Sequence, residues 1–443
     1  MSDQTSKALA RVLLALLVGA LSERAFAQAP APQPAPAQQP AAAPPPGEQA
    51  PATPGKEQPR SGAAVDPATG KRLNEAVEHL NAQRYGEARA ALSNLSLDRL
   101  SPYELSRTQQ LFAAVAQAEG KYGAARDHLG KAIASGGLND QETSTARFQI
   151  AQLFMAEDKW REGVNALKEW FATAENPNSA AYHLLAVAYY QLGDFASALE
   201  PAQKAIDLSG GKPQESWLQL LLALRLEREE YKLAVPILKQ LVEAAPTKKN
   251  YWIQLSAVNA QIGSYPDAAV PLQLAYHAGL LTEEADFERL AQILLQITVP
   301  YRAAQILSQA IEQGKVKGDV KRYELLANCW LAAREYEKAM APLRRAAEVS
   351  GDGDLYQRLA EVHIQREEWP KAVETLRLAL NKGKLKHPGN AQLLMGLSLY
   401  NQKKMTDARP WFERAQGHAE SRSQAEGWLR HIDNELESES QES

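Results

Sequence analysis

A repeat of about 35 residues runs through most of this chain and constrains its fold more than any other feature. An aromatic residue, replaced once by proline and once by methionine, recurs at spacings of 33 to 38 residues: Tyr85, Tyr122, Trp160, Phe195, Tyr231, Tyr265, Pro300, Tyr336, Trp369 and Met405. A small residue follows each of these markers by three positions: Ala88, Ala125, Gly163, Ala198, Ala234, Ala268, Ala303, Ala339, Ala372 and Ala408. Apolar residues around the markers keep the spacing of one helical face. We therefore expect pairs of amphipathic helices, each pair packed against the next.

The recurring small residue indicates close packing within each pair, because only a small side chain lets two helices approach closely. A large residue usually follows it four positions later, as at Leu129, Leu167 and Leu238. Together these features resemble the tetratricopeptide repeat family, over residues 69–420. The resemblance implies an all-α fold, an α-solenoid of about ten helical hairpins.

The chain after the tenth hairpin reads as one further amphipathic helix, over residues 421–437. Ala425, Trp428, Leu429 and Ile432 fall on one face of this helix. A single helix without a partner of its own is typical of a cap at the end of a stack. Residues 438–443 are expected to form a solvated acidic tail.

Residues 1–27 have the pattern of a secretory signal peptide. Lys7 and Arg11 precede an apolar run, and residues 25–27 supply the small-x-small sequence that a signal peptidase accepts. Glu23 and Arg24 make the cleavage region more polar than usual, so an uncleaved membrane anchor is the alternative. No cysteine follows the apolar run, which argues against a lipid anchor. The expected location is the periplasm.

Residues 28–68 have the composition of a linker. Residues 28–67 hold 12 of the chain's 25 prolines, mixed with alanine and glutamine. Such a segment has almost nothing to bury, so we expect a disordered, partly polyproline II tether. The alternative is that it serves as a ligand for a proline-binding groove.

Charge and motifs narrow the classes of function. The net charge of −4 predicts no general attraction to nucleic acid or to anionic lipid, so any membrane contact would be peripheral. The only cysteine, Cys329, lies in a helical pattern and is expected to be a buried small hydrophobe. The chain lacks HExxH, Walker A, GxGxxG and GxSxG motifs, and its eight histidines have no metal-ligand spacing. We expect no catalytic residue, no cofactor and no metal site, and therefore not an enzyme.

The resemblance to tetratricopeptide repeats implies a binding surface on the first helix of each hairpin, along a concave groove. Counting from the small residues places these side chains in the groove: Gln110, Gln152, His183, Tyr190, Gln219, Gln292, Asn328, Gln357 and Tyr400. Amide side chains both donate and accept hydrogen bonds, which suits the backbone of an extended peptide. Some members of the family hold a C-terminal carboxylate with paired basic residues, but here Lys321 stands nearly alone, which argues against carboxylate capture.

The last repeat carries a second resemblance. Its features are the Gly-x-Leu-x-x-Pro connector from Gly383 to Pro388, the LLMGLSLYNQ segment at residues 393–402, and the helix containing Ala425 and Trp428. These are similar to periplasmic tetratricopeptide proteins that are encoded beside TonB, ExbB and ExbD energy-transduction components. The resemblance implies a protein or peptide partner from such a system.

Two hypotheses of function remain open. The first is a non-enzymatic periplasmic scaffold for protein–protein interaction, in TonB-dependent energy transduction or uptake. The second is a scaffold for cell-envelope or polysaccharide assembly and export, in which Tyr190 and Tyr400 would stack on sugars.

Overall fold

The structure is a computed structural model that describes residues 65–442. Within that range all regular structure is helical, in 21 α-helices and one short 3-10 helix, which confirms the all-α prediction. The expected signal peptide and the linker up to residue 64 lie outside the described residues. Among the helices described, none combines the length and the apolar content that a bilayer crossing needs.

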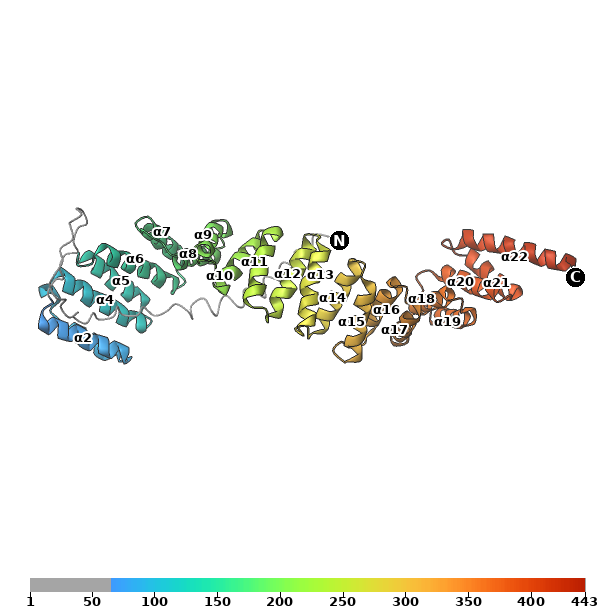
Figure 1. Cartoon of the computed structure of the whole chain (residues 1–443), viewed down its shortest axis with the longest axis horizontal. Helices are drawn as coiled ribbons and strands as arrows, with labels where there is room; N and C mark the ends of the chain where they lie inside the picture. Colours follow the sequence, from blue (N-terminus) through green and yellow to red (C-terminus); the bar gives the residue numbers. More distant parts are fainter. Residues whose placement is uncertain (1–64, 443) are drawn as a thin grey trace, which may run out of the picture. The chain divides into compact units, whose positions relative to one another are not determined.

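The chain divides into two units, the first of which ends at Ala244 and contains five stacked helical hairpins (Figure 1). Within each hairpin the two helices pack on each other, and the second helix packs on the first helix of the next hairpin. The paired helices are α2 (Pro67–Asn81) with α3 (Tyr85–Ser93), α4 (Pro102–Ala118) with α5 (Tyr122–Ala134), α6 (Asp140–Met155) with α7 (Trp160–Phe171), α8 (Ser179–Gln191) with α9 (Phe195–Asp207), and α10 (Glu215–Glu227) with α11 (Tyr231–Ala244), with the 3-10 helix η1 (Leu97–Arg99) between α3 and α4.

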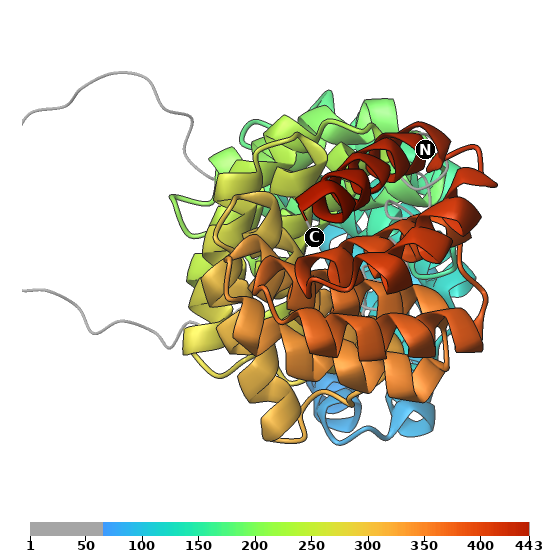
Figure 2. The same cartoon turned by 90° about the vertical axis from the view of Figure 1, so that its right-hand side faces the viewer.

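The second unit begins at Ala245 and contains five more hairpins followed by a single helix. The hairpins are α12 (Lys249–Gln261) with α13 (Tyr265–His277), α14 (Glu284–Gln296) with α15 (Pro300–Glu312), α16 (Val320–Ala332) with α17 (Tyr336–Ser350), α18 (Gly353–Gln365) with α19 (Trp369–Lys382), and α20 (Pro388–Asn401) with α21 (Met405–Gln416). The single helix is α22 (Arg422–Glu442), which packs against α21 as the expected cap (Figure 2).

The ends of the helical region differ slightly from the expected bounds. The first helix begins at Pro67, where the side chain of Asp66 accepts hydrogen bonds from the backbone N–H groups of Ala68 and Thr69. At the other end, α22 continues to Glu442, so residues 438–442 extend the helix instead of forming a separate tail. This segment contains no glycine or proline, and glutamate is a good helix former.

The repeat markers have one structural role in all ten hairpins. Each marker is the first residue of the second helix of its hairpin. Each of the nine alanines three positions later is 0% exposed, and Gly163 is buried in the same position. At Gly163 a Cβ atom would lie 2.6 Å from Cε, the flexible end of the Met155 side chain, so the glycine leaves room for this methionine. The packing requirement inferred from the sequence is therefore confirmed.

A second recurring position escaped the sequence pattern. The residue two positions before each marker has a left-handed backbone, with φ between 56° and 81°, and it forms the turn between the two helices. Only three of these ten residues are glycine; the ten are Gln83, Gly120, Asp158, Gly193, Glu229, Gly263, Thr298, Arg334, Glu367 and Lys403. A left-handed backbone usually favours glycine, because other side chains adopt it only at a cost. Since most of these ten residues are not glycine, no glycine pattern in the sequence marks the position.

Thr298 is the most strained of these residues, because a β-branched side chain disfavours its φ of 59°. We expect Thr298→Gly to stabilise the chain by about 0.5–1 kcal/mol, since the relief of strain exceeds the added entropy of the unfolded chain. Urea unfolding followed by circular dichroism measures the change. The control Gln305→Gly, at an exposed position inside α15, should destabilise instead. A urea midpoint for Thr298→Gly below that of the native chain would contradict the left-handed backbone at this residue.

Candidate functional site

The nine residues predicted to line the groove all lie on first helices of hairpins. We call this set the first-helix face; it comprises Gln110 on α4, Gln152 on α6, His183 and Tyr190 on α8, and Gln219 on α10 in the first unit, and Gln292 on α14, Asn328 on α16, Gln357 on α18 and Tyr400 on α20 in the second. They occupy three equivalent positions, 15, 11 or 8 residues before the buried small residue of their hairpin. Equivalent positions on stacked first helices present one side to solvent, so each unit has its own row of these side chains.

His183 is a partly buried member of the row in the first unit. Its ring stacks on Trp217 of the next hairpin, with ring centroids 5.5 Å apart. Burial lowers the pKa of His183 to about 4, so the imidazole is neutral at pH 7 and carries one donor and one acceptor nitrogen. Its Nδ1 atom is buried and has no hydrogen-bond partner within the part of the chain that the structure describes.

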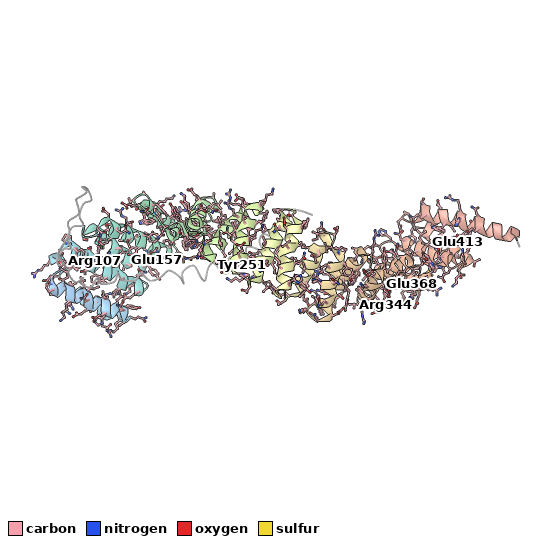
Figure 3. All side chains as sticks on the ribbon, viewed as in Figure 1. Arg107, Glu157, Tyr251, Arg344, Glu368 and Glu413 are labelled. Carbon is pink, nitrogen blue, oxygen red and sulfur yellow. The ribbon has the colours of Figure 1, made fainter. Side chains whose placement is uncertain are left out.

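Two other members of this row, Gln110 and Gln219, form hydrogen bonds with neighbouring side chains. Gln110 accepts a hydrogen bond from Nη1 of Arg107 at 3.0 Å, and Arg107, labelled in Figure 3, also pairs with Glu142 of the next hairpin. Gln219 donates to Glu215 at 3.1 Å, while Gln152 is exposed.

Tyr190 adds a hydroxyl to the same row. Its ring packs on Phe195 at the start of the next helix, with centroids 5.4 Å apart. Burial, and then the charge of Glu227, raises the pKa of Tyr190. The phenol therefore stays protonated at neutral pH and can donate a hydrogen bond.

The row in the second unit joins amides to charged side chains. Asn328 accepts a hydrogen bond from Nη2 of Arg358, which lies on the next first helix. Gln357 donates from Nε2 to Glu361 at 3.0 Å, and its Oε1 atom is buried without a hydrogen-bond partner among the described residues. Gln292 is exposed.

Tyr400 differs from the other eight residues because α22 covers it. Its ring lies 5.1 Å from the ring of Trp428, and its hydroxyl contacts Nε2 of His431 at 2.9 Å and Oε1 of Glu435 at 3.0 Å. The sequence pattern predicted α22 as a cap but did not show that it would hold Tyr400.

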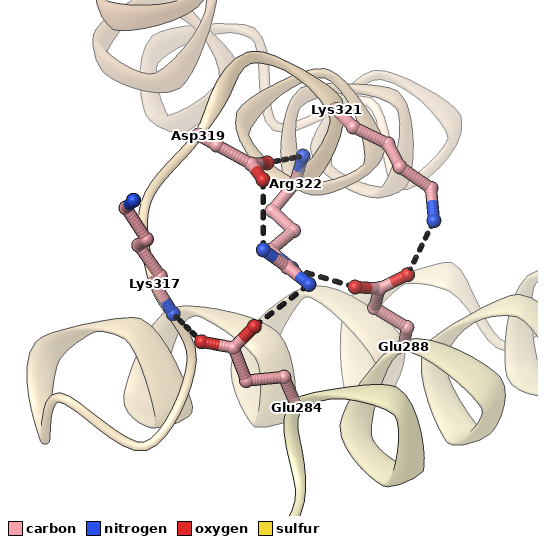
Figure 4. Close-up of polar contacts among 6 residues, drawn as sticks. All are labelled: Glu284, Glu288, Lys317, Asp319, Lys321 and Arg322. Carbon is pink, nitrogen blue, oxygen red and sulfur yellow. Dashed lines mark hydrogen bonds and ion pairs between the residues drawn. The ribbon is translucent and has the colours of Figure 1, made fainter.

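A charged cluster joins α14 to α16 and to the residues just before α16 (Figure 4). Arg322 is its centre, with ion pairs to Glu284 at 2.8 Å, to Glu288 at 2.6 Å and to Asp319 at 2.7 Å. Lys321 also pairs with Glu288, at 2.7 Å, so the lysine that stood alone in the sequence has a partner. The cluster thus joins two successive hairpins through their first helices.

The cluster holds Glu288 ionised although its side chain is only 9% exposed. Burial alone would raise the pKa of Glu288, but hydrogen bonds from Lys321 and Arg322 outweigh burial and hold this pKa below its ordinary value. The cluster was not predicted from the sequence. The spacing of opposite charges could have indicated it, because Glu288 and Arg322 are 34 residues apart, which is one repeat. Arg107 and Glu142 pair across 35 residues in the same way.

The cysteine and the possible metal-binding side chains of the described residues show no reactive arrangement. Cys329 is 0% exposed, and burial raises the pKa of its thiol to about 12, so it stays protonated and acts as a small hydrophobe. Within residues 65–442 no three His, Cys, Asp or Glu side chains are placed to hold a metal ion.

Comparison with known proteins gives one family match. The tetratricopeptide repeat model matches residues 148–213, which span α7 to α9, and residues 358–425, which span α19 to α21. Both stretches contain complete hairpins with a buried small residue. No curated protein matches the chain.

Solved structures with similar folds include several repeat proteins. A tetratricopeptide repeat protein from Parabacteroides merdae is 13% identical, covers 57% of this chain and 98% of its own length, and gives a TM-score of 0.31. The C-terminal part of a repeat-containing protein from Cytophaga hutchinsonii is 14% identical, covers 64% and 99%, and gives 0.32. MamA from Desulfovibrio magneticus is 21% identical, covers 38% and 93%, and gives 0.30.

These TM-scores mark only loose superposition, so the family is identified by the sequence match together with the hairpins themselves. The matched stretches repeat the marker, the left-handed turn and the buried small residue that recur in all ten hairpins. The chain thus contains tetratricopeptide repeats at residues 148–213 and 358–425, and its other hairpins have the same marker, turn and buried small residue.

Proposed function

We propose that this protein is a non-enzymatic periplasmic scaffold that holds an extended segment of a partner protein along the first-helix face. Tetratricopeptide repeats generally bind proteins or peptides, and the family match supports an interaction scaffold of that kind. The periplasmic location rests on the signal-peptide pattern of residues 1–27.

The observation that carries the proposal is a pair of buried polar atoms on the first-helix face, one in each unit. Nδ1 of His183 and Oε1 of Gln357 lack hydrogen-bond partners among the described residues, and leaving a buried polar atom unpaired is costly. A peptide backbone supplies both N–H donors and C=O acceptors at regular intervals, so an extended segment would satisfy atoms of either kind. Gln152 and the hydroxyl of Tyr190 would add contacts within the first unit, and Gln292 would add one within the second.

The finer proposal is that the partner belongs to a TonB, ExbB and ExbD energy-transduction system, as the resemblance of the last repeat implies. The alternative is a scaffold for cell-envelope or polysaccharide assembly and export. The glycines of the last repeat also serve packing: a Cβ atom at Gly396 would lie 2.7 Å from the ring of Phe412, and one at Gly389 would lie 2.2 Å from Oγ of Ser421. Because packing alone accounts for these glycines, the partner is best identified by capturing it directly.

The experiment is affinity capture of the full chain from the periplasm of its source, followed by mass spectrometry. We expect the double variant Gln152→Ala/Gln292→Ala to retain at least about tenfold less of the partner than the native chain, because it removes exposed amides from both units. The matched control, Gln240→Ala/Gln305→Ala, removes exposed amides from second helices and should capture the native amount.

Two results would count against the proposal at different levels. Equal capture by both double variants would remove the first-helix face as the binding surface. Capture that depends on this face but brings envelope-assembly enzymes in place of TonB-system components would favour the alternative scaffold.

A further inference from the structure

A pocket of about 480 Å³ lies in the first unit, away from the first-helix face. Its lining residues come from three successive helices, α7, α8 and α9, which Figure 1 labels, and from the connector between α7 and α8. Tyr182, Leu185 and Tyr189 of α8 line the pocket, whereas His183 and Tyr190 of the same helix belong to the first-helix face. At 100° per residue these two sets point in directions that differ by roughly a quarter to a third of a turn. The pocket is therefore a separate surface.

The lining residues explain why the space between these hairpins stays open. On α9 they include Ser197, which is small, and Pro201, whose ring is compact and fixed. On α7 the lining side chains are Phe171 and Lys168, and Pro177 lies in the connector that follows. The lining thus combines aromatic and apolar side chains with the charged groups of Lys168, Glu200 and Lys204, and the volume has room for a large side chain.

The rim of the pocket carries an excess of positive charge. Nζ of Lys168 lies 5.6 Å from the ring centroid of Tyr189, and Nζ of Lys204 lies 5.4 Å from that of Tyr182. Lys168 forms no ion pair within 4.0 Å among the described residues, and the carboxylate of Asp194 interacts with it only at longer range. Lys204 pairs with Glu200 at 2.9 Å, but both side chains are well exposed, at 48% and 78%, so this pair is weak and easily exchanged.

We propose that this outer pocket is a second docking site, which takes a short acidic segment of a partner protein that inserts one aromatic side chain. The aromatic ring would lie on Leu185 and against Phe171, where apolar area is available. Carboxylates on both sides of it would meet Lys168 at one end and Lys204 at the other, and the charges complement each other. The hydroxyls of the two tyrosines supply further donors to those carboxylates.

The test uses a fluorescein-labelled synthetic pentapeptide, one phenylalanine with two glutamates on each side and with capped ends, titrated with the full chain by fluorescence anisotropy. We expect saturable binding that weakens as salt is added, because exposed charges are screened. Lys168→Glu should weaken binding by at least about tenfold, since it replaces an attraction by a repulsion. Lys168→Met, which only removes the charge, should weaken it by about three- to fivefold.

The matched control is Lys239→Glu, at the equivalent position of α11, which lies outside the pocket and should bind the peptide as the native chain does. A peptide with alanine in place of phenylalanine should bind at least about tenfold more weakly, because the apolar anchor is lost. Equal weakening by Lys168→Glu and Lys239→Glu, equal binding of the alanine peptide, or no binding at about 1 mM chain would each overturn the proposal.

Discussion

Replacing Phe412 by alanine is expected to lower the free energy of unfolding by about 3–5 kcal/mol, more than any other single substitution considered for this chain. Phe412 is 0% exposed, and its ring stacks on Trp428 of α22 with centroids 5.7 Å apart and planes within 7°. On its other side it contacts Gly396, where even one added carbon would lie 2.7 Å from the ring. The ring therefore joins α20, α21 and the cap, and its loss leaves a cavity that none of these helices can fill.

The loss should be local, because each hairpin of a repeat stack is stabilised mainly by its neighbours. We expect amide hydrogen exchange to accelerate in residues 388–435 and to stay at the native level in residues 65–244. The control Leu378→Ala removes a side chain that is 43% exposed on α19 and should cost less than about 1 kcal/mol. Equally faster exchange in both regions would contradict local stabilisation.

Much of the fold could be predicted because the demands of packing recur. Ala303 and Ala339 are buried for the same reason one repeat apart, so the pattern shows ten hairpins without any knowledge of their surroundings. The left-handed turns could not be found in this way. Arg334 and Lys403 adopt a backbone that glycine prefers, and a side chain carries no mark of the φ angle that its neighbours impose.

The helices that carry the nine candidate residues could be predicted from the sequence, but the side chains around these residues could not. Counting from the small residues put all nine candidates on first helices, and whether they contact a partner stays a prediction. The sequence did not show that Trp217 would cover the ring of His183, or that α22 would hold Tyr400. Each of these contacts joins side chains about one repeat apart, and a pattern within one hairpin contains no information about them.

The charged cluster between α14 and α16 supports a second large effect. We expect Arg322→Met to lower the free energy of unfolding by about 2–3 kcal/mol. The substitution leaves Glu284, Glu288 and Asp319 without their common cationic partner. Arg322 is 16% exposed, so the cost should be somewhat below that of breaking a fully buried ion pair. Urea unfolding at pH 7 measures it.

The neighbouring lysine gives a matched control for the effect of burial. Lys321 pairs with the same carboxylate of Glu288 but is 70% exposed, so Lys321→Met should cost less than about 1 kcal/mol. Equal costs for the two variants would contradict the central role of Arg322.

The pH dependence of the Arg322→Met cost tests its electrostatic origin. The folded pKa of Glu288 lies below its unfolded value, so the cluster stabilises the fold fully above the unfolded value, about 4.3, and less as the pH falls through the folded one. The difference in unfolding free energy between the native chain and Arg322→Met should therefore narrow below about pH 4, where the carboxylate of Glu288 becomes protonated and needs no cation. A gap that stayed constant from pH 7 to pH 3 would mean that the guanidinium acts through packing of its stem and not through its charge.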